Sequence, residues 1–318
     1  MLENAAILLS AGFGTRLKPL TDEIPKPAIP FLGKPMIWYA MNALKKAGIQ
    51  NMAANVHHLP DRMSQTLREC ADLLQLPEIR IFQEKNEILG TGGGARSCMD
   101  LLPEAHNYII YHGDVLCGAD ISQDLESHHQ SGADVTMVVA PRPENSKLGM
   151  VGIDPENRVC RIRDWYRKNM DSSTDLMKCC FTGIHVIRRE ILKTLPLEHN
   201  SCLVTELYPQ MMADDLSINA CLIHDFFADI GTPETYLEAQ RIILDNPHRL
   251  PGAEIFKPEQ KADITIHEPV SIMPDVQIPS GVEIGPNVCL SHKAKIFSGE
   301  ILAETMIFGH YRLLSRSV

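Results

Sequence analysis

The sequence predicts an α/β fold, in which a mixed, mostly parallel β-sheet flanked by helices is followed by a short parallel β-helix. Two observations support the sheet: short apolar runs of strand length alternate with segments of helical spacing, and the alternation continues to about residue 245. A six-residue repeat near the C-terminus supports the β-helix. A stretch with three prolines at 246–258 separates the two parts. We therefore expect a large domain at 1–247 and a small one at 258–318.

The alternation starts at the N-terminus. Residues 6–9 form an apolar run, and residues 35–47 show apolar side chains at helical spacing between Pro35 and Gly48. The pattern continues and predicts strands at 49–56, 79–82, 108–111 and 135–140 and helices at 60–74 and 120–129. Strands that alternate with helices of this length imply a mostly parallel sheet covered on both faces.

The second half of the large domain has shorter strands and longer connections, with strands expected at 150–153, 159–162, 181–186 and 218–223. This change predicts a mixed part of the sheet, where a substrate pocket can form. Thr232-Pro233-Glu234 then predicts the start of a helix that runs to about residue 244, because a capping hydroxyl precedes a proline and an acid.

The C-terminal repeat has a period of six. One series of apolar residues runs from Val270 to Ala294 in steps of six, and a second runs from Ile272 to Ile296. Three such units make one triangular coil, so about two coils are expected. An irregular proline-rich tail does not explain this regularity. So short a stack has exposed ends, and we expect the neighbouring domain or a second copy of the chain to cover them.

The composition excludes several classes of protein. The formal net charge is −10, which argues against nonspecific binding to nucleic acid. No apolar run reaches the roughly 18–20 residues that cross a bilayer, and no basic segment precedes the N-terminal apolar run, so neither a membrane span nor a signal peptide is expected. The nine cysteines form no CxxC pair. They indicate reduced thiols in the cytoplasm rather than a disulfide framework or a zinc site.

A glycine-rich loop follows the first expected strand. Gly12 and Gly14 allow a tight turn that brings backbone N–H groups against an anion, while Arg16 and Lys26 supply two cations. A loop at the carboxyl end of a parallel strand is also where ligands bind in open α/β sheets. The alternative is a glycine turn with incidental surface cations. That alternative does not explain why two glycines and the cations Arg16 and Lys26 occur together between Gly12 and Pro27.

Two familiar phosphate loops do not fit. The kinase-type loop requires a serine or threonine after its lysine, and here Pro35 follows Lys34. The dinucleotide fingerprint requires a third glycine, and Leu17 occupies that place. The loop therefore belongs to a different class of nucleotide-binding protein.

The segment Gly12-Phe13-Gly14-Thr15-Arg16-Leu17-Lys18-Pro19-Leu20-Thr21, followed by Pro25-Lys26-Pro27, resembles the signature of the sugar-1-phosphate nucleotidylyltransferases. The other segments that resemble this family occur in the family's order and are Glu87 to Gly94, Gly113-Asp114, Phe181 to Val186 and Ala228 to Tyr236. The resemblance covers residues 1 to about 245. It implies a Rossmann-like nucleotide-diphospho-sugar transferase fold, and many members carry a short left-handed β-helix after this domain.

The resemblance also implies a reaction. An oxygen of a sugar 1-phosphate attacks the α-phosphorus of a nucleoside triphosphate, and pyrophosphate leaves. Mg²⁺ is the expected cofactor, with Asp114 and Asp229 as its ligands. Arg16 is assigned to the triphosphate and Lys26 to the α-phosphate. The residues assigned to the nucleotide are Leu9, Ala11, Gly12, Gly14, Thr15, Gln83, Gly90 and Thr91, and those assigned to the sugar are Gly149 and Glu206.

The sequence departs from the family at two places. His112 stands where the family has an asparagine before Gly-Asp. The lysine that grips the sugar phosphate in many members is missing from the stretch 161–165, where Arg163 or Arg167 can substitute. The chain resembles both the mannose-1-phosphate guanylyltransferases and the N-acetylmuramate-1-phosphate uridylyltransferases.

GTP and mannose 1-phosphate are slightly preferred as substrates. Three alternatives stay open: a uridylyltransferase acting on N-acetylmuramate or another hexose 1-phosphate, a cytidylyltransferase of the phosphocholine type, and a non-catalytic paralogue that senses nucleotide sugars. Acyl transfer by the hexad repeat is a fourth reading, but His267 and His292 are interpreted as surface residues.

Overall fold

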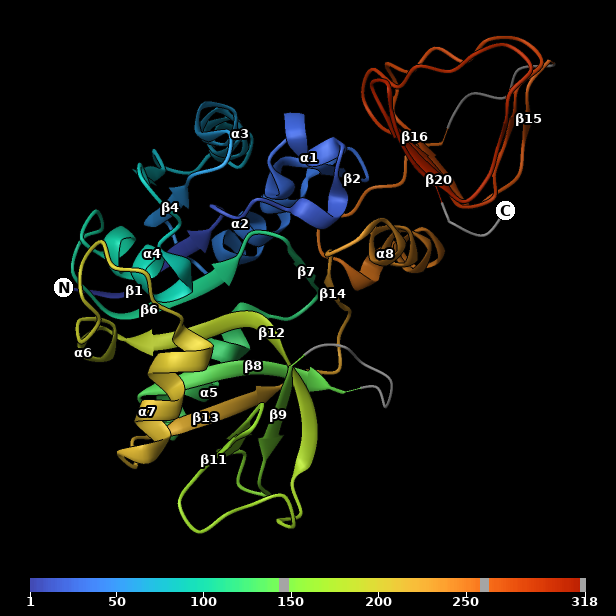
Figure 1. Cartoon of the computed structure of the whole chain (residues 1–318). Coiled ribbons are helices and arrows are strands. Elements are labelled where there is room, and N and C mark those ends of the chain that lie inside the picture. The colour runs from blue at the N-terminus through green and yellow to red at the C-terminus, as the bar shows by residue number, and fades with distance from the viewer. Residues whose placement is uncertain (143–148, 258–262, 315–318) are drawn as a thin grey trace.

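The computed structural model describes residues 1–142, 149–257 and 263–314. Within them, one ten-stranded sheet forms the centre of the large domain, with strand order β11-β10-β9-β12-β6-β1-β4-β5 (Figure 1). Off this path, β8 pairs with β12, and β13 pairs with β8. The strands of the sheet are β1 (Leu2–Leu9), β4 (Met52–Val56), β5 (Arg80–Gln83), β6 (Ala105–His112), β8 (Val135–Pro141), β9 (Met150–Ile153), β10 (Val159–Ile162), β11 (Trp165–Tyr166), β12 (Met177–Arg188) and β13 (Ile218–Leu222).

The sheet divides as the sequence predicts. Strands β6, β1, β4 and β5 are parallel, whereas β12 runs antiparallel to β6, β8 and β9. The short strand pairs β2 (Pro30–Phe31) with β3 (Lys34–Pro35) and β7 (Val115–Cys117) with β14 (Phe227–Asp229) lie beside it. The parallel half places three loops at the carboxyl ends of β1, β4 and β6, which is where ligands bind in such sheets.

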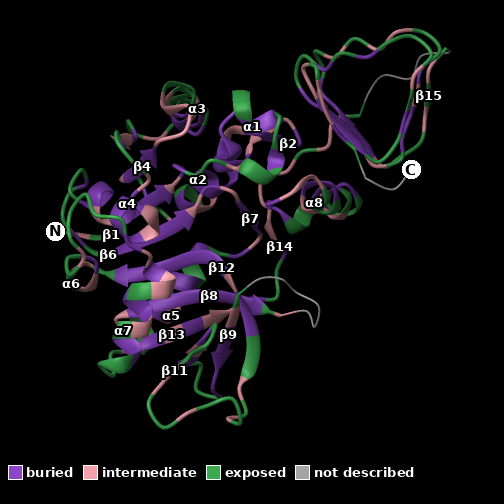
Figure 2. Cartoon of the chain, in the orientation of Figure 1, coloured by how far each residue is buried: buried purple, intermediate pink, exposed green. Residues whose placement is uncertain are grey.

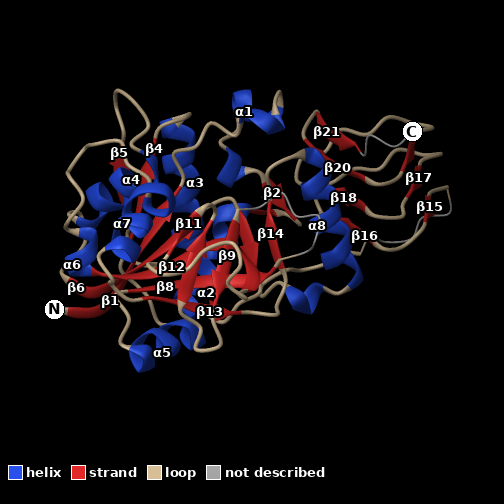
Figure 3. Cartoon of the chain, turned by 60° about the horizontal axis from the view of Figure 1, so that its bottom comes forward, coloured by secondary structure: helices blue, strands red, loops and turns tan. Residues whose placement is uncertain are grey.

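Helices cover both faces of the sheet (Figure 3). They are α1 (Leu20–Glu23), α2 (Met36–Lys46), α3 (Pro60–Leu73), α4 (Gly90–Met99), α5 (Ile121–Ser131), α6 (Arg189–Leu192), α7 (Tyr208–Ala213) and α8 (Pro233–Asp245). The capping predictions are confirmed: Asp120 accepts a hydrogen bond from the backbone of Ser122, and Thr232 and Thr235 form a reciprocal capping box at α8. Figure 2 shows that most strands at the centre of the sheet are buried.

Helix α4 was not expected. The sequence pattern indicates no helix between the strands expected at 79–82 and 108–111, yet the glycine run begins a helix at Gly90. Its glycines are required by close packing, because a Cβ at Gly93 would lie 2.0 Å from the His199 carbonyl oxygen and one at Gly90 would lie 2.4 Å from that of Ser201. Glycine is a poor helix former, so the low helix propensity of this run does not predict a helix.

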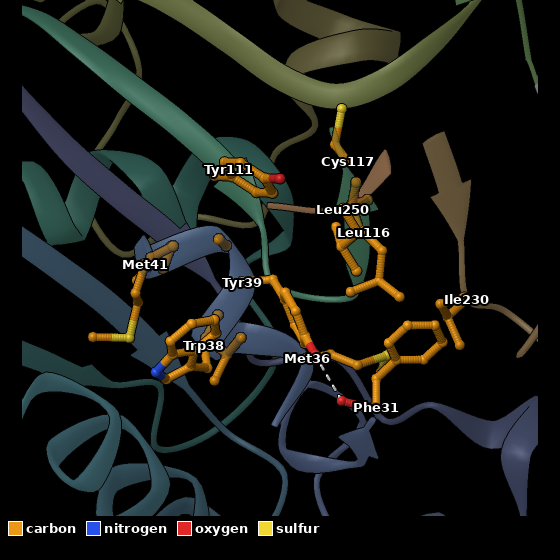
Figure 4. Close-up of a cluster of buried hydrophobic side chains, with 14 of the residues drawn as sticks. Phe31, Met36, Trp38, Tyr39, Met41, Tyr111, Leu116, Cys117, Ile230 and Leu250 are labelled. Atoms are coloured by element: carbon orange, nitrogen blue, oxygen red, sulfur yellow. Dashed lines mark hydrogen bonds between the residues drawn. The ribbon is translucent and has the colours of Figure 1, made fainter. Parts of the chain in front are cut away.

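The hydrophobic core beside α2 is built from aromatic and sulfur-containing side chains. Phe31, Trp38 and Tyr39 pack with methionines such as Met36 and Met41, and the Tyr39 hydroxyl donates a 2.9 Å hydrogen bond to the Phe31 carbonyl (Figure 4). The bond satisfies a phenol that burial would otherwise leave unpaired. A second core cluster covers the other face of the sheet.

The C-terminal coil (residues 263–314) confirms the predicted repeat. Parallel ladders join β15 (Thr265–Ile266), β17 (Glu283–Ile284) and β19 (Ile301–Leu302), and likewise β16 (Val270–Ile272), β18 (Val288–Leu290) and β20 (Thr305–Phe308), with β21 (Tyr311–Leu314) antiparallel at the end. The ladder has three levels rather than the two expected. Val288 pairs with Thr305 after 17 residues rather than 18, so the six-residue pattern breaks before the last level.

The coil packs against the large domain. Cys289, Met306 and Leu313 belong to the same core cluster as Phe31 and Trp38. From α8, the Gln240 amide donates hydrogen bonds of 2.9 Å and 3.2 Å to the carbonyls of Asn287 and Thr305. The large domain therefore covers part of the coil, while Ile301 and Leu314 at its last level stay exposed. The boundary between domains 1–247 and 258–318 stays a prediction, and its residues 258–262 and 315–318 lie outside the described residues.

In the part of the chain that the structure describes, no helix is both long enough and apolar enough to span a membrane. None of the nine cysteines forms a disulfide.

A buried acid on α5 makes the stability depend on pH. Asp124 is only 1% exposed, and burial raises its pKa to about 6, although a hydrogen bond from Cys221 opposes the rise. Between about pH 4 and pH 6 the unfolded chain ionises this group while the folded chain keeps it protonated, so stability falls as the pH rises through that window. Above about pH 6, Asp124 is ionised in both states, and the folded protein bears the full free-energy cost of the buried charge.

Asp124→Asn is therefore expected to stabilise the protein by about 1–3 kcal/mol at pH 8 and by far less at pH 4.5. Chemical denaturation of both proteins at the two pH values measures this. Glu126→Gln, on an exposed position of the same helix, serves as the control. An equal gain at both pH values would contradict the explanation.

Candidate active site

Two cavities meet at the carboxyl ends of β1 and β6. The first cavity contains the predicted residues Leu9, Ala11 and Gly12 from the loop after β1, together with Gly90 and Thr91 from the start of α4. Lys26, His112 and Asp114 also line it. The structure therefore brings together segments from three separate parts of the sequence, as the predicted binding site requires.

The glycine turn after β1 is shaped by Gly14. Its φ is +63°, and a Cβ here would lie 2.9 Å from the Cβ of Lys26 and 3.0 Å from Thr21. Thr21 donates a 3.0 Å hydrogen bond to the Gly14 carbonyl, which fixes the turn. Gly14 and Thr15 therefore build the loop without themselves lining the cavity. Glycine at this position allows Lys26 to reach the site.

The two aspartates are brought together by a short strand pair that the sequence did not predict. Asp114 follows β6, and Asp229 ends β14, which pairs with β7 so that Asp229 stands opposite Val115. Lys26 forms an ion pair with Asp114, and its Nζ lies 3.8 Å from an oxygen of Asp229. The two carboxylates, 115 positions apart in the sequence, thus converge on one cation.

The charges shift the two carboxyl groups in opposite directions. Burial acts to raise the pKa of Asp114, but Lys26 and His112 outweigh it, so the pKa lies below its usual value. The pKa of Asp229 is raised by burial and by the repulsion of Asp114. Two carboxylates this close repel each other unless cations lie between them, and Lys26 alone does not fully offset the repulsion.

Arg16 reaches the same place from the glycine turn. Its guanidinium lies over Gly231, where an added Cβ would be 2.9 Å from it. Arg16 and Asp229 line the second cavity together. The four residues predicted to be catalytic, Arg16, Lys26, Asp114 and Asp229, therefore surround one point.

The second cavity opens on the far side of Asp114. Gly149, Arg163, Phe181 and Thr205 line it, and it shares Thr91, His112 and Asp114 with the first cavity. Gly149, which the resemblance assigns to the sugar, is one of the residues that line this cavity. The Arg163 side chain lies close to Gly149, because its Nε is 3.3 Å from the place that a Cβ on Gly149 would occupy.

The structure separates the two arginines that can replace the family's lysine. Arg167 is held away from the cavities, because its guanidinium hydrogen-bonds the Asp215 carboxylate at 3.1 Å and the Leu216 carbonyl at 2.9 Å. Arg163 is exposed, has no ion pair among the described residues and lines the second cavity. Its place at a two-residue turn between β10 and β11, with φ +53°, directs it there.

Besides Gly14 and Thr15, two more predicted residues lie outside both cavities. Gln83 ends the edge strand β5 with an exposed side chain, and Glu206 is exposed on a π-helical turn at Leu203–Leu207. In place of Glu206, its neighbour Thr205 and the preceding Cys202 line the second cavity. The π-helical turn changes the direction of successive side chains, and no sequence pattern reveals such a turn.

His112 lies between the two cavities. Its ring packs edge-on against Phe181 and His185, with centroids 6.0 Å away in each case, and above Gly183, whose φ is +87°. Burial lowers the pKa of His112. It is therefore a packed residue at the site rather than a surface group.

The donor set suits a hard divalent cation. Asp114 and Asp229 already share one cation, and Mg²⁺ is typically bound by one or two carboxylates together with substrate phosphates. No group of three or more metal-ligating side chains is found among the described residues.

Comparisons with known proteins place the chain in a family. A family model described as "Nucleotidyl transferase" matches residues 5–246. Mannose-1-phosphate guanylyltransferase of Mycobacterium tuberculosis is 28% identical over 302 residues, covering 92% of this chain and 80% of the relative. UTP–glucose-1-phosphate uridylyltransferase of Synechocystis is 26% identical and covers 97% of this chain and 84% of the relative.

A solved structure shares the fold. HddC from Yersinia pseudotuberculosis superimposes with a TM-score of 0.61 at 23% identity, covering 75% of this chain and 98% of HddC. The family match spans most of the chain and includes every residue that lines the two cavities, whereas the coil lies outside it. The chain therefore belongs to the nucleotidyl transferase family, in the group of sugar-1-phosphate nucleotidylyltransferases.

Proposed function

We propose that this enzyme joins GTP and mannose 1-phosphate to form GDP-mannose and pyrophosphate. One observation carries the proposal: Lys26, Asp114 and Asp229 converge where a cavity lined by the glycine turn meets a cavity lined by Arg163. Two polyanionic substrates can meet there with their reacting groups beside the charges. Relatives named mannose-1-phosphate guanylyltransferase support the choice of substrates.

In this reaction, a phosphate oxygen of the sugar phosphate attacks the α-phosphorus. The new O–P bond forms as the bond from the α-phosphorus to the bridging oxygen breaks, and pyrophosphate leaves with that electron pair. A phosphate monoester is itself a nucleophile, so no serine, cysteine or histidine is needed. The work of the protein is to align the two substrates and offset their charge.

Each group of residues has a part in this alignment. The turn from Ala11 to Gly14 offers backbone N–H groups to the triphosphate, and Arg16 and Lys26 offset its negative charge. Asp114 and Asp229 would hold Mg²⁺, which supplies charge neutralisation on the phosphate oxygens when it is bound. Gly90 and Thr91 would contact the nucleoside, and Gly149 the sugar.

A screen of GTP, UTP, CTP and ATP against several sugar 1-phosphates and phosphocholine tests the proposal through the release of pyrophosphate. We expect the fastest turnover with GTP and mannose 1-phosphate. A relative named for UTP and glucose 1-phosphate makes uridylyl transfer the second candidate. Nucleotide binding without pyrophosphate release from any pair would instead support a sensing role.

Arg163 is the residue we assign to the sugar phosphate. Arg163→Ala is expected to raise the KM for the sugar phosphate by about 10–100-fold while the KM for the nucleotide changes little, because a charge-assisted phosphate contact contributes roughly 1.5–3 kcal/mol. Steady-state kinetics with each substrate varied in turn measures both values. Arg167→Ala is the matched control, and equal effects of the two variants would contradict the assignment.

Two further proposals concern the setting of the enzyme. The free cysteines support a reducing compartment such as the cytoplasm. The last level of the coil exposes Phe297, Ile301 and Leu314, which supports contact between two copies of the chain. Light scattering during size-exclusion chromatography tests that contact.

A further inference from the structure

A buried polar network joins the loops around the first cavity. Ser10 follows β1, Asn55 lies in β4, and Glu84 follows β5, and their exposed fractions are 2%, 3% and 3%. β1, β4 and α4 lie side by side at this edge of the sheet (Figure 1). Ser10 and Asn55 also line the cavity. The network therefore forms the wall directly behind the proposed nucleotide site.

The hydrogen bonds of the network form one chain. The Ser10 backbone N–H donates to Oδ1 of Asn55 at 2.8 Å, and the Ser10 hydroxyl donates to the Asn55 carbonyl at 2.5 Å. Nδ2 of Asn55 donates to Oε1 of Glu84 at 2.7 Å. The other carboxylate oxygen, Oε2, accepts from the backbone N–H of Leu89 at 2.9 Å. Glu84 thus links the glycine turn after β1 to the first residues of α4.

We propose that Glu84 is a positioning residue that sets the distance between the phosphate-binding turn and the start of α4. It acts through Asn55 and Ser10 on one side and through Leu89 on the other. The inference rests on the proposed function, because it assigns the two loops to the two ends of one nucleotide. Glu84 itself lines neither cavity.

A buried carboxylate at this place is not explained by stability alone. Among the described residues, no lysine, arginine or histidine forms an ion pair with Glu84, so its charge is offset only by hydrogen bonds. Burying a carboxylate in this way costs free energy that an apolar side chain would not cost. What the carboxylate adds is two acceptors on one rigid group, which can fix two donors from different loops.

Helix α4 carries a glycine to make room for the network. A Cβ at Gly94 would lie 2.4 Å from Nδ2 of Asn55 and 3.0 Å from Oε1 of Glu84. The last glycine of the run therefore serves this contact rather than a turn, since α4 continues through it. Glycine lowers the helix propensity of α4 at this position, and it lets α4 pack directly against Asn55 and Glu84.

Glu84→Gln tests the proposal. The new amide has one acceptor for two donors, so either Asn55 or Leu89 loses its partner. We expect the KM for the nucleotide to rise about 10–100-fold, since small misplacements of bound groups have effects of that size. The KM for the sugar phosphate is expected to stay within about twofold. Glu87→Gln, an exposed residue of the same loop, is the matched control.

A double variant separates positioning from a loss of packing. In Glu84→Gln combined with Asn55→Asp, the carboxylate moves to position 55, where it accepts from the Ser10 N–H and from the new amide at 84. The carbonyl of that amide then accepts from Leu89, so every hydrogen bond is restored. We expect the nucleotide KM to return to within about threefold of the wild-type value.

The outcomes are distinguishable. An unchanged nucleotide KM in Glu84→Gln, an equal rise in both KM values, or no rescue by the double variant would overturn the proposal. If Glu84→Gln does not fold, Glu84→Asp, which keeps the charge and shortens the reach, is measured with the same criteria. The nucleotide is the one that the wild-type enzyme turns over. Failure of the wild type to release pyrophosphate with any pair would refute the proposed function instead.

Discussion

Asp114→Asn is expected to lower turnover by roughly 10³-fold or more, and Asp229→Asn to have an effect of similar size. Each variant removes one of the two carboxylates that converge on Lys26 and that would hold the metal. An amide keeps the shape of the side chain but not the negative charge on which the ligand role depends. The measurement is pyrophosphate release at saturating substrates.

The fold should tolerate both changes. The pKa of Asp229 is raised by burial and by the neighbouring Asp114, so removing either charge relieves repulsion, and Lys26 keeps one partner. We therefore expect the melting temperature of each variant to stay within a few degrees of the wild type. Asp225→Asn, exposed in the segment before β14, should leave turnover unchanged. Near-normal rates in both site variants would remove the metal assignment.

Local signals in the sequence predicted most of the site. The glycine turn, Arg16 and Lys26 lie within one short stretch, so their nearness follows from the chain itself. Asp114 and Asp229 are different, because residues so distant in sequence meet only through the pairing of β7 with β14. The sequence identified each of them through the resemblance, and only the structure shows the two carboxylates facing one cation.

The parts that the sequence missed depend on packing. The sequence gives no sign of helix α4, because its glycines are required by close contacts with the backbone at 199–201. The hydrogen bonds of Glu84 form only when three strands are in register. The choice between Arg163 and Arg167 depends on which partner each arginine finds, and only Arg167 is fixed by Asp215. These are relations between distant segments, which local propensity and periodicity do not contain.

The relation between the coil and the large domain is also absent from the sequence pattern. The repeat with its own period, after a proline-rich stretch, suggests a separate module. In the structure, however, Met306 of β20 is completely buried and shares a cluster with Phe31 and Tyr236 of the large domain. Because this hydrophobic cluster crosses the predicted boundary, we expect the two parts to unfold as one cooperative unit.

Met306→Ala is therefore expected to destabilise the whole protein, including the catalytic domain, by about 2–4 kcal/mol, because a cavity would open in a shared core. For a chain of this size the melting temperature should fall by roughly 5–10 °C in a single transition. Gln277→Ala, at an exposed position of the same coil, is the control and should change the melting temperature little.

A chain that ends at residue 257 extends the same reasoning. Without the coil, α8 loses the partners of Gln240 and the large domain exposes the apolar side chains that Cys289, Met306 and Leu313 cover. We expect this shortened chain to aggregate or to melt more than 10 °C below the full chain, since exposed core surface of this kind is not compensated elsewhere. Differential scanning calorimetry of both chains measures the two melting temperatures. If the shortened chain kept the full melting temperature and catalytic rate, the coil would be an independent module, and the shared cluster would contribute nothing to the fold of the catalytic domain.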